Sequence, residues 1–237
     1  MKHEWRHRPA DEPIIAEVES GIYEQYIRVR QDDVVIDGGA QIGWFTKTVV
    51  DRASRVYAFE ANPDNFKFLD ANTAPYYWNT TAHQLALWNE ETERSFWIHR
   101  GNVGGGSMFD LEQSTERIVT VRTITLDSFI GTGFRKLPHF IKLDVEYAEF
   151  NVLDGARKML AEARPVIAME AHPPGDGNQA WWTALHAKLP PNYWIVNYPA
   201  PQDIWQARVV TMVPNERAGE IWQPVVEPSL TIGKPLA

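Results

Sequence analysis

The chain contains no cysteine, has no long hydrophobic run and carries fewer basic than acidic residues. Without cysteine there are no disulfides, no thiolate nucleophile and no cysteine-ligated zinc site. No stretch approaches the roughly 18 apolar residues of a membrane span, and residues 1–12 carry charges and histidines without the apolar run of a secretory signal. We therefore expect a cytoplasmic protein that does not span a membrane.

Basic residues are outnumbered, with 23 Lys and Arg against 31 Asp and Glu, a net charge of −8 and a pI near 5.4. Binding to a phosphate backbone needs clustered positive charge, so the composition argues against DNA or RNA as the main partner. The 237 residues, 44% of them hydrophobic, are typical of a globular protein. In the absence of repeats, low-complexity blocks or linkers, we predict a single domain over residues 1–237, with an N-terminal extension (1–20) and a proline-rich tail (214–237).

Strand-like and helix-like segments alternate along the chain. Apolar, β-branched runs predict strands, and apolar residues at helical spacing predict helices. The predicted strands are 33–36, 55–59, 81–87, 94–99, 117–126, 139–143, 166–169, 193–197 and 207–213; the predicted helices are 44–51, a helix capped by Asn62 with Pro63 at its first position, 146–161 divided near Gly155, and 179–189. This order predicts an α/β fold: a doubly wound, mostly parallel sheet with helices on both faces and a late antiparallel hairpin.

Three acidic residues stand at the ends of predicted strands: Asp37, Glu60 and Asp144. Ligands of open α/β sheets bind at the carboxyl ends of the strands. The glycines after Asp37 let the backbone approach a ligand closely, and a carboxylate at Glu60 can accept hydrogen bonds from ribose hydroxyls. The arrangement predicts an adenosine-containing cofactor.

Two such cofactors fit this pattern to different degrees. The segment from Gly38 to Gly43 is a degenerate dinucleotide fingerprint, with Ala40 where the second glycine would let a pyrophosphate approach. S-adenosylmethionine instead carries a cationic sulfonium and amino group, which the carboxylate of Asp37 would attract and a pyrophosphate would not match. The sign of the charge favours S-adenosylmethionine, with NAD as the alternative.

Several motifs in this order resemble those of the FkbM-type methyltransferases. They are V-I-D-G-G-A-Q-I-G-W-F-T at 35–46, Y-A-F-E-A-N-P at 57–63, T-L-D at 125–127, I-K-L-D-V-E-Y-A-E-F followed by V-L-D-G-A at 141–156, and M-E-A-H-P at 169–173. The sequence departs from the family pattern at Ala61, where proline is usual, and at Tyr147, where glycine is usual.

The resemblance implies the class I methyltransferase fold, with a seven-stranded sheet whose last strand is antiparallel. It also implies S-adenosylmethionine as donor and O-methylation of a small-molecule or glycan acceptor, such as a sugar or natural-product hydroxyl. The upstream G-x-Y-E element implies that Glu24 reaches the cofactor, although Glu24 could equally form a salt bridge. The predicted cofactor-binding residues are Glu24, Asp37, Gly39, Ala40, Gly43, Glu60, Ala61, Asn62 and Asp144.

Methyl transfer to an oxygen needs an aligned nucleophile and a group that removes its proton. The predicted catalytic residues are Asp144, Glu146 and His172. Each also has a structural interpretation: Asp144 as a helix cap, Glu146 as an acid in the first turn of a helix, and His172 as a loop residue. Together with Glu170 they could instead hold a divalent cation, which we expect less.

Two further interpretations remain open in the sequence. The glycine-rich segment 101–107 lacks the Lys-Ser/Thr of a P-loop and is expected to be a flexible connection or lid, with Asn102 and Ser107 near the acceptor. The rival functions are an NAD-dependent oxidoreductase and a non-catalytic module that binds S-adenosylmethionine.

Overall fold

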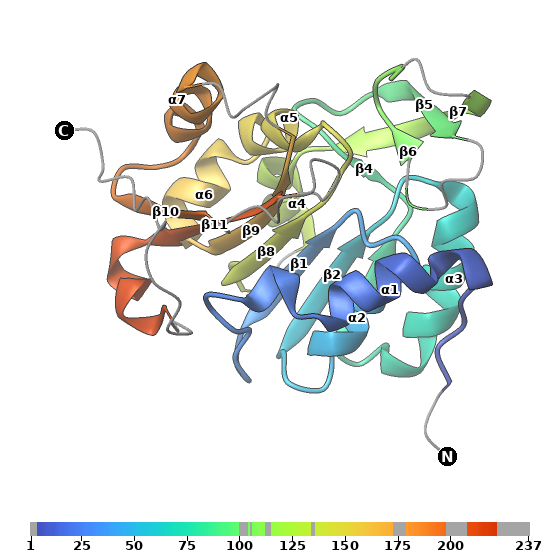
Figure 1. The fold of residues 1–237 in the computed structure, drawn as a ribbon, viewed down its shortest axis with the longest axis horizontal. Helices are drawn as coiled ribbons and strands as arrows, with labels where there is room; N and C mark the ends of the chain where they lie inside the picture. Colours follow the sequence, from blue (N-terminus) through green and yellow to red (C-terminus); the bar gives the residue numbers. More distant parts are fainter. Residues whose placement is uncertain are drawn as a thin grey trace.

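The computed structural model describes residues 4–99, 104, 106–111, 115–133, 136–172, 179–197 and 208–221. It contains a seven-stranded sheet in the order β10-β11-β9-β8-β1-β2-β3 and a four-stranded sheet in the order β4-β7-β5-β6 (Figure 1). Asn102 and the proline turn after His172 lie outside the described residues.

The larger sheet has β1 near its centre, paired in parallel with β2 on one side and β8 on the other. Its strands are β1 (Val34–Gly38), β2 (Arg55–Phe59), β3 (Thr80–His83), β8 (Phe140–Leu143), β9 (Val166–Ala171), β10 (Tyr193–Asn197) and β11 (Arg208–Pro214). Strand β11 runs antiparallel to both β9 and β10. The predicted parallel sheet and late antiparallel hairpin are thus confirmed.

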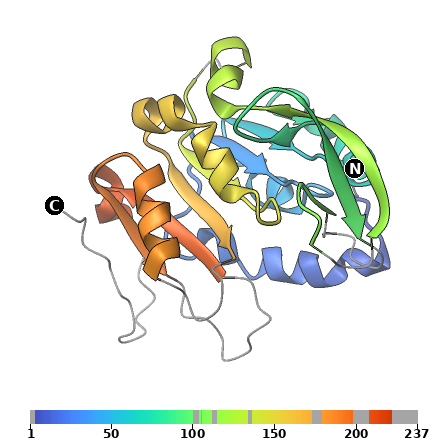
Figure 2. The same cartoon turned by 90° about the horizontal axis from the view of Figure 1, so that it is seen from above.

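Helices cover both faces of this sheet (Figure 2). Neighbouring residues of β1 point to opposite faces, as in any strand: Val35 packs with α1 (Glu12–Glu19) and α2 (Trp44–Val49), while Ile36 packs with α4–α7. The remaining helices are α3 (Pro63–Thr73), α4 (Leu126–Gly133), α5 (Glu149–Asp154), α6 (Arg157–Ala163) and α7 (Gln179–Lys188). Asn62 caps α3 as predicted, its side chain accepting a bond from the Asp64 N–H at 3.0 Å.

The smaller sheet lies beyond the carboxyl ends of β1 and β2 (Figure 1). It is built from β4 (Ala86–Leu87), β5 (Glu93–His99), β6 (Gly106–Ser107) and β7 (Thr115–Ile124), with β5 and β7 antiparallel as predicted. The prediction of one strand over 81–87 is wrong. Strand β3 stops pairing with β2 after His83, and from Ala86 the chain pairs with β7 of the smaller sheet as β4. The smaller sheet thereby forms a roof over the strand ends.

Two helix boundaries also differ from the predictions. The segment 146–161 divides at Gly155, where a Cβ would stand 2.2 Å from the Trp88 carbonyl oxygen. The first helix, however, begins at Glu149, because Glu146 and Tyr147 adopt positive φ angles of 51° and 74°. Leu126 begins α4 instead of ending a strand, and the Thr125 hydroxyl caps α4 by accepting the Ser128 N–H at 3.0 Å.

The N-terminal segment is fastened to the glycine turn after β1. The carboxylate of Asp11 is fully buried; it accepts bonds from the Arg8 guanidinium at 2.8 Å and from the Gln41 side chain at 2.9 Å. Arg8 also donates to Asn65 of α3. Among the described residues, every helix is too short or too polar to traverse a bilayer.

Candidate active site

A cavity of about 160 Å³ lies at the carboxyl ends of β1, β2, β8 and β9. Its walls come from the strand ends, the loop after β8, helix α1 and the smaller sheet. Its polar lining residues are Glu17, Gln41, Glu60, Asp144, Glu146 and Glu170; its apolar ones include Ile14, Phe59, Leu87, Phe96 and Met108. It sits where ligands bind in open α/β sheets.

The turn after β1 can only be built with glycine at position 39. Gly39 has φ +71°, and a Cβ there would stand 1.7 Å from the Asp144 carbonyl oxygen. The turn is therefore pressed directly against the end of β8. Gly43 has φ 91° and precedes α2, while the Ala40 N–H donates to the Phe59 carbonyl at 2.8 Å. These contacts hold the floor of the cavity rigidly against β2 and β8.

Lys142 is the buried cation beneath this floor. Its Nζ donates to the Gly39 carbonyl at 2.7 Å and lies 3.5 Å from the Asp37 carboxylate and 3.3 Å from that of Asp144. Burial alone would lower the pKa of Lys142, but the carboxylates of Asp144 and Asp37 outweigh burial and raise it. Lys142 thus ties the glycine turn to the ends of β1 and β8.

Asp144 faces the cavity, and Lys142 and Tyr23 fix the position of its carboxylate. The Tyr23 hydroxyl donates to its Oδ2 at 2.8 Å. Burial would raise the pKa of Asp144, but the charge of Lys142 and the hydrogen bonds that Asp144 accepts hold this pKa below its ordinary value. Burial and the charge of Asp144 raise the pKa of the Tyr23 hydroxyl well above its ordinary value. Asp144 is an anion at neutral pH.

Glu60 lines the cavity from the end of β2. Its two carboxylate oxygens accept the backbone N–H groups of Gln41 at 2.8 Å and Asn62 at 2.7 Å. Burial raises the pKa of Glu60 to about 7, although both N–H groups oppose this shift. A hydroxyl donor such as ribose would add a further bond to this carboxylate, and such bonds favour its charged form.

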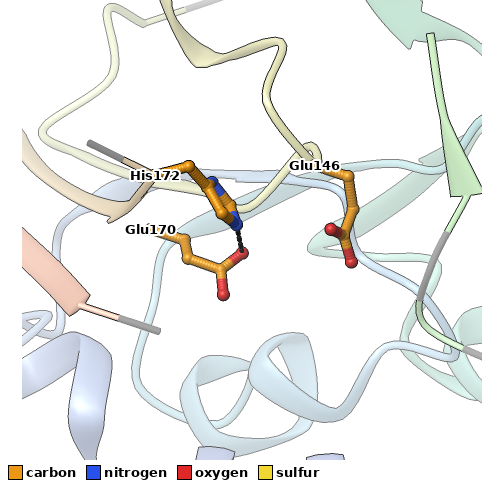
Figure 3. A group of neighbouring side chains, drawn as sticks. All are labelled: Glu146, Glu170 and His172. Atoms are coloured by element: carbon orange, nitrogen blue, oxygen red, sulfur yellow. Dashed lines mark ion pairs between the residues drawn. The ribbon is translucent and has the colours of Figure 1, made fainter. Parts of the chain in front are cut away.

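Glu146, Glu170 and His172 form a second polar group beside Asp144. Figure 3 shows the three side chains pointing into a common space, and one potential ligand atom from each lies within 4.8 Å of the others. Burial, then the charge of Asp144, raises the pKa of Glu146 to about 8 and that of Glu170 well above its ordinary value. Burial would lower the pKa of His172, but Glu149 and the other carboxylates raise it.

The structure brings some of the predicted site residues to the cavity and leaves others behind its walls. Gly39, Glu60, Ala61, Asp144 and Glu146 line it. His172 lies next to the lining residue Glu170, its Nε2 3.5 Å from the carboxylate.

The other predicted residues lie outside the lining. Asp37 is fully buried below the turn, accepting the Thr46 hydroxyl at 2.7 Å, and Ala40, Gly43 and Asn62 shape the turn and the start of α3. Glu24 forms a salt bridge, which was the alternative prediction for this residue. Its carboxylate pairs with the Arg52 guanidinium and accepts a hydrogen bond from the Val29 N–H. Ser107 Oγ donates to the Glu146 carbonyl at 2.8 Å, which supports the loop carrying Glu146.

Sequence reasoning missed Glu17, Tyr23 and Lys142. Lys142 stands directly opposite Asp37 in the register of β1 and β8, and a lysine in an otherwise apolar strand next to an aspartate was a usable signal for a buried pair. Both Glu17 and Tyr23 lie before the first strand of the sheet. Tyr23 belongs to the G-x-Y-E element, from which only Glu24 was predicted to reach the cofactor, and nothing in the local sequence of Glu17 indicates that it lines the cavity.

Residues 37–207 match the family described as the Methyltransferase FkbM domain. The chain belongs to this family. The family depends on S-adenosylmethionine, which confirms the predicted cofactor. The hexuronic acid methyltransferase AglP of Haloferax volcanii is 30% identical over 159 residues, which are 67% of this chain and 64% of AglP. The chain therefore matches somewhat less than two thirds of that relative's length.

Two solved structures share the fold. A methyltransferase FkbM from Methylobacillus flagellatus KT has a TM-score of 0.56 and 18% identity, covering 78% of this chain and 44% of that protein. A methyltransferase from Streptococcus mutans in complex with SAH has a TM-score of 0.51 and 12% identity, covering 87% and 98%. These likenesses confirm the class I methyltransferase fold.

The cavity fits the cationic cofactor of this family. Its lining contains the carboxyl groups of Glu17, Glu60, Asp144, Glu146 and Glu170, whereas the nearby Lys142 is directed to backbone carbonyls and to Asp37 and Asp144. Such a lining attracts a sulfonium and an amino group and repels a pyrophosphate. The absence of a side chain at Gly39 brings the backbone to the cavity surface.

Proposed function

We propose that this protein transfers a methyl group from S-adenosylmethionine to a hydroxyl oxygen of a sugar or of a related natural product. The observation that carries the proposal is the acidic cavity at the carboxyl ends of β1, β2 and β8 in a chain of the FkbM family. The 30% identity to a hexuronic acid methyltransferase supports a sugar acceptor.

Within this proposal, the cavity residues divide into two groups. Glu60 binds the ribose hydroxyls, with Gly39 and Ala61 forming the surface beside it, and Asp144 and Glu17 face the cationic methionine end. Asp37, Ala40, Gly43 and Asn62 hold the turn and the start of α3 in position. When bound, S-adenosylmethionine supplies a methyl group on a cationic sulfur, which an acceptor oxygen displaces with loss of its proton.

The proposed catalytic residues are Asp144, Glu146 and His172. Asp144 is fixed by Lys142 and Tyr23 and so orients the groups around it without moving. The Glu146 carboxylate and the His172 imidazole lie in one group with Glu170, and we assign them the activation of the acceptor hydroxyl. The smaller sheet covers this side and reduces access of water.

Titration calorimetry with S-adenosylmethionine, its demethylated product and NAD tests the cofactor. We expect the first two to bind and NAD not to bind. Glu60→Gln should weaken S-adenosylmethionine binding at least tenfold, because the charged acceptor for ribose is lost, whereas the exposed control Glu162→Gln should bind like the wild type. Binding of NAD alone, or unchanged affinity in Glu60→Gln, would refute the assignment.

Incubation of the protein with S-adenosylmethionine and a panel of sugars, followed by mass spectrometry, tests the reaction. Asp144→Asn should lose turnover more than cofactor affinity if Asp144 acts on the acceptor. A fully active Asp144→Asn variant would remove it from the catalytic set. A methylated nitrogen would contradict O-methylation, and a methyl ester formed on a carboxylate would contradict the hydroxyl acceptor.

A further inference from the structure

The group of Glu146, Glu170 and His172 has the composition of a metal site. Two carboxylates and one imidazole, from the loop after β8 and the end of β9, place potential ligand atoms within 4.8 Å of one another (Figure 3). Ligand distances to a first-row divalent metal are about 2.0–2.2 Å. Small rotations of these side chains would bring all three onto one ion.

We propose that Glu146, Glu170 and His172 bind a divalent metal ion beside the cavity. Mixed oxygen and nitrogen donors suit first-row cations such as Mn²⁺ better than Mg²⁺, which prefers oxygen ligands alone. Three protein ligands also leave coordination positions for water or an acceptor, as in catalytic metal sites.

The surroundings of His172 support its role as a ligand. Its Nε2 faces Glu170, while its Nδ1 lies 3.8 Å from the Glu149 carboxylate, is buried and has no hydrogen-bond partner. A carboxylate behind the second nitrogen is the usual support of a metal-bound histidine, because it fixes the tautomer and the ring. The Tyr147 ring lies against the imidazole, tilted by 30° with centroids 4.1 Å apart, and restricts its rotation.

The charges around the group also call for a cation. Lys142 pairs with Asp37 and Asp144, and its remaining bonds go to the carbonyls of the glycine turn. Among the described residues, no lysine or arginine pairs with Glu146 or Glu170, and no described group donates a hydrogen bond to the Glu146 carboxylate. In the part of the chain that the structure describes, the His172 imidazole beside Glu170 is the group of opposite charge that pairs with these carboxylates. A divalent cation held by all three side chains would supply a larger compensating charge.

The role of this ion rests on the proposed function. An ion at this position would bind the acceptor hydroxyl and lower its pKa, so that the proton is lost to water before the oxygen attacks the methyl carbon. His172 is then a ligand, and no protein base is required. Glu149 is a positioning residue, because it acts through the His172 imidazole.

Electron paramagnetic resonance of added Mn²⁺, after dialysis against EDTA, tests the site without any acceptor. We expect one bound Mn²⁺ per chain in the wild type. His172→Ala and Glu146→Gln should each weaken binding more than tenfold, Glu149→Gln should weaken it less, and Glu162→Gln should bind like the wild type. S-adenosylmethionine binding by each variant shows that the cavity is still folded.

Absence of a bound Mn²⁺ in the wild type, or equal binding in folded His172→Ala and Glu146→Gln, would overturn the metal site. Either result would leave the proposed function standing if S-adenosylmethionine still binds. Failure to bind S-adenosylmethionine, with or without Mn²⁺, would instead refute the proposed function.

Discussion

Lys142 is the residue on which the arrangement of the site depends most. It lies between the carboxylates of Asp37 and Asp144, and it is 3% exposed. The buried carboxylate of Asp37 and the partly exposed carboxylate of Asp144 repel each other when no cation separates them. The same side chain therefore supports both the stability of the sheet and the position of a proposed catalytic group.

Replacing Lys142 with methionine should destabilise the protein by about 3–5 kcal/mol, since removal of this partner leaves the buried charge of Asp37 uncompensated. The matched control Lys158→Met, at an exposed lysine of α6, should change the free energy of unfolding by less than about 0.5 kcal/mol. Urea unfolding followed by tryptophan fluorescence measures both. Similar stabilities of the two variants would show that the buried pairs contribute little.

At the residue scale, the sequence predicted acidic residues at the ends of the strands. It did not predict the groups that pair with their carboxylates, Lys142 and Tyr23. Glu60 and Asp144 were predicted because a carboxylate at the end of a buried strand is conspicuous in one dimension, and Glu146 because it follows Asp144 by two residues; all three line the cavity. Tyr23 is more than a hundred positions from its partner Asp144 in the chain, and only the folded sheet brings them together. Asp37 was expected to touch the cofactor, yet its carboxylate points to Lys142 and Thr46.

At the scale of elements, two motif residues that resemble family positions have structural tasks. Asp127 of α4 accepts the backbone N–H groups of Lys158 and Met159 at 3.1 and 2.8 Å, so it caps the start of α6 from another helix. Gly155 passes so close to Trp88 that no side chain fits. These contacts explain the T-L-D and G-A motifs without any part in catalysis.

The elements missed or misplaced by sequence reasoning share a physical cause. Glu146 and Tyr147 have good helical neighbours, but their positive φ angles delay the helix until Glu149. Those angles are set by contacts with the roof, such as the bond from Ser107 to the Glu146 carbonyl. Tertiary contacts of this kind override local propensity and leave no periodic signal in the sequence.

Helix α1 contributes to the cavity although it precedes the residues that match the family. Ile14 and Glu17 line the cavity, and the family match begins at residue 37. Glu17 lies close enough to Asp144 and Lys142 for their charges to act on its pKa, which burial raises. The N-terminal extension expected from the sequence is thus part of the proposed cofactor site.

We expect Glu17→Gln to weaken S-adenosylmethionine binding about three- to tenfold, because one anion facing the cationic end of the cofactor is lost. Glu12→Gln, an exposed change on the same helix, serves as the control and should have no effect. Calorimetry at low ionic strength measures the difference. Equal affinities of the two variants would mean that α1 provides only an apolar wall.

At the scale of the whole molecule, stability should fall as pH rises from about 5 to 8. Glu60 titrates near 7 in the folded protein, against an ordinary value of 4.5. Between pH 4.5 and pH 7 the folded state therefore holds a proton that the unfolded chain has lost. The contribution of this proton to the free energy of unfolding disappears above pH 7. The raised pKa values of Glu146 and His172 act in the same direction, while the lowered pKa of His83 acts against it.

The expected loss from Glu60 is about 2.5 kcal/mol between pH 5 and pH 8, in protein free of cofactor and metal. Urea unfolding across this range measures it. Glu60→Gln should flatten the profile, whereas Glu162→Gln should follow the wild type. A free energy of unfolding that rises with pH over this range would contradict the assignment.

We expect the fastening of the N-terminal segment to determine how ligands reach the cavity. One wall, helix α1, is anchored through the buried Asp11, whose carboxylate binds both Arg8 and Gln41, and breaking such a buried pair is costly. Another part of the lining is Gly106 of β6, a two-residue edge strand paired only with β5 among the described strands. Exchange of spent cofactor for fresh should therefore proceed past β6, and the rate at which this short edge lifts would limit how long the product stays bound.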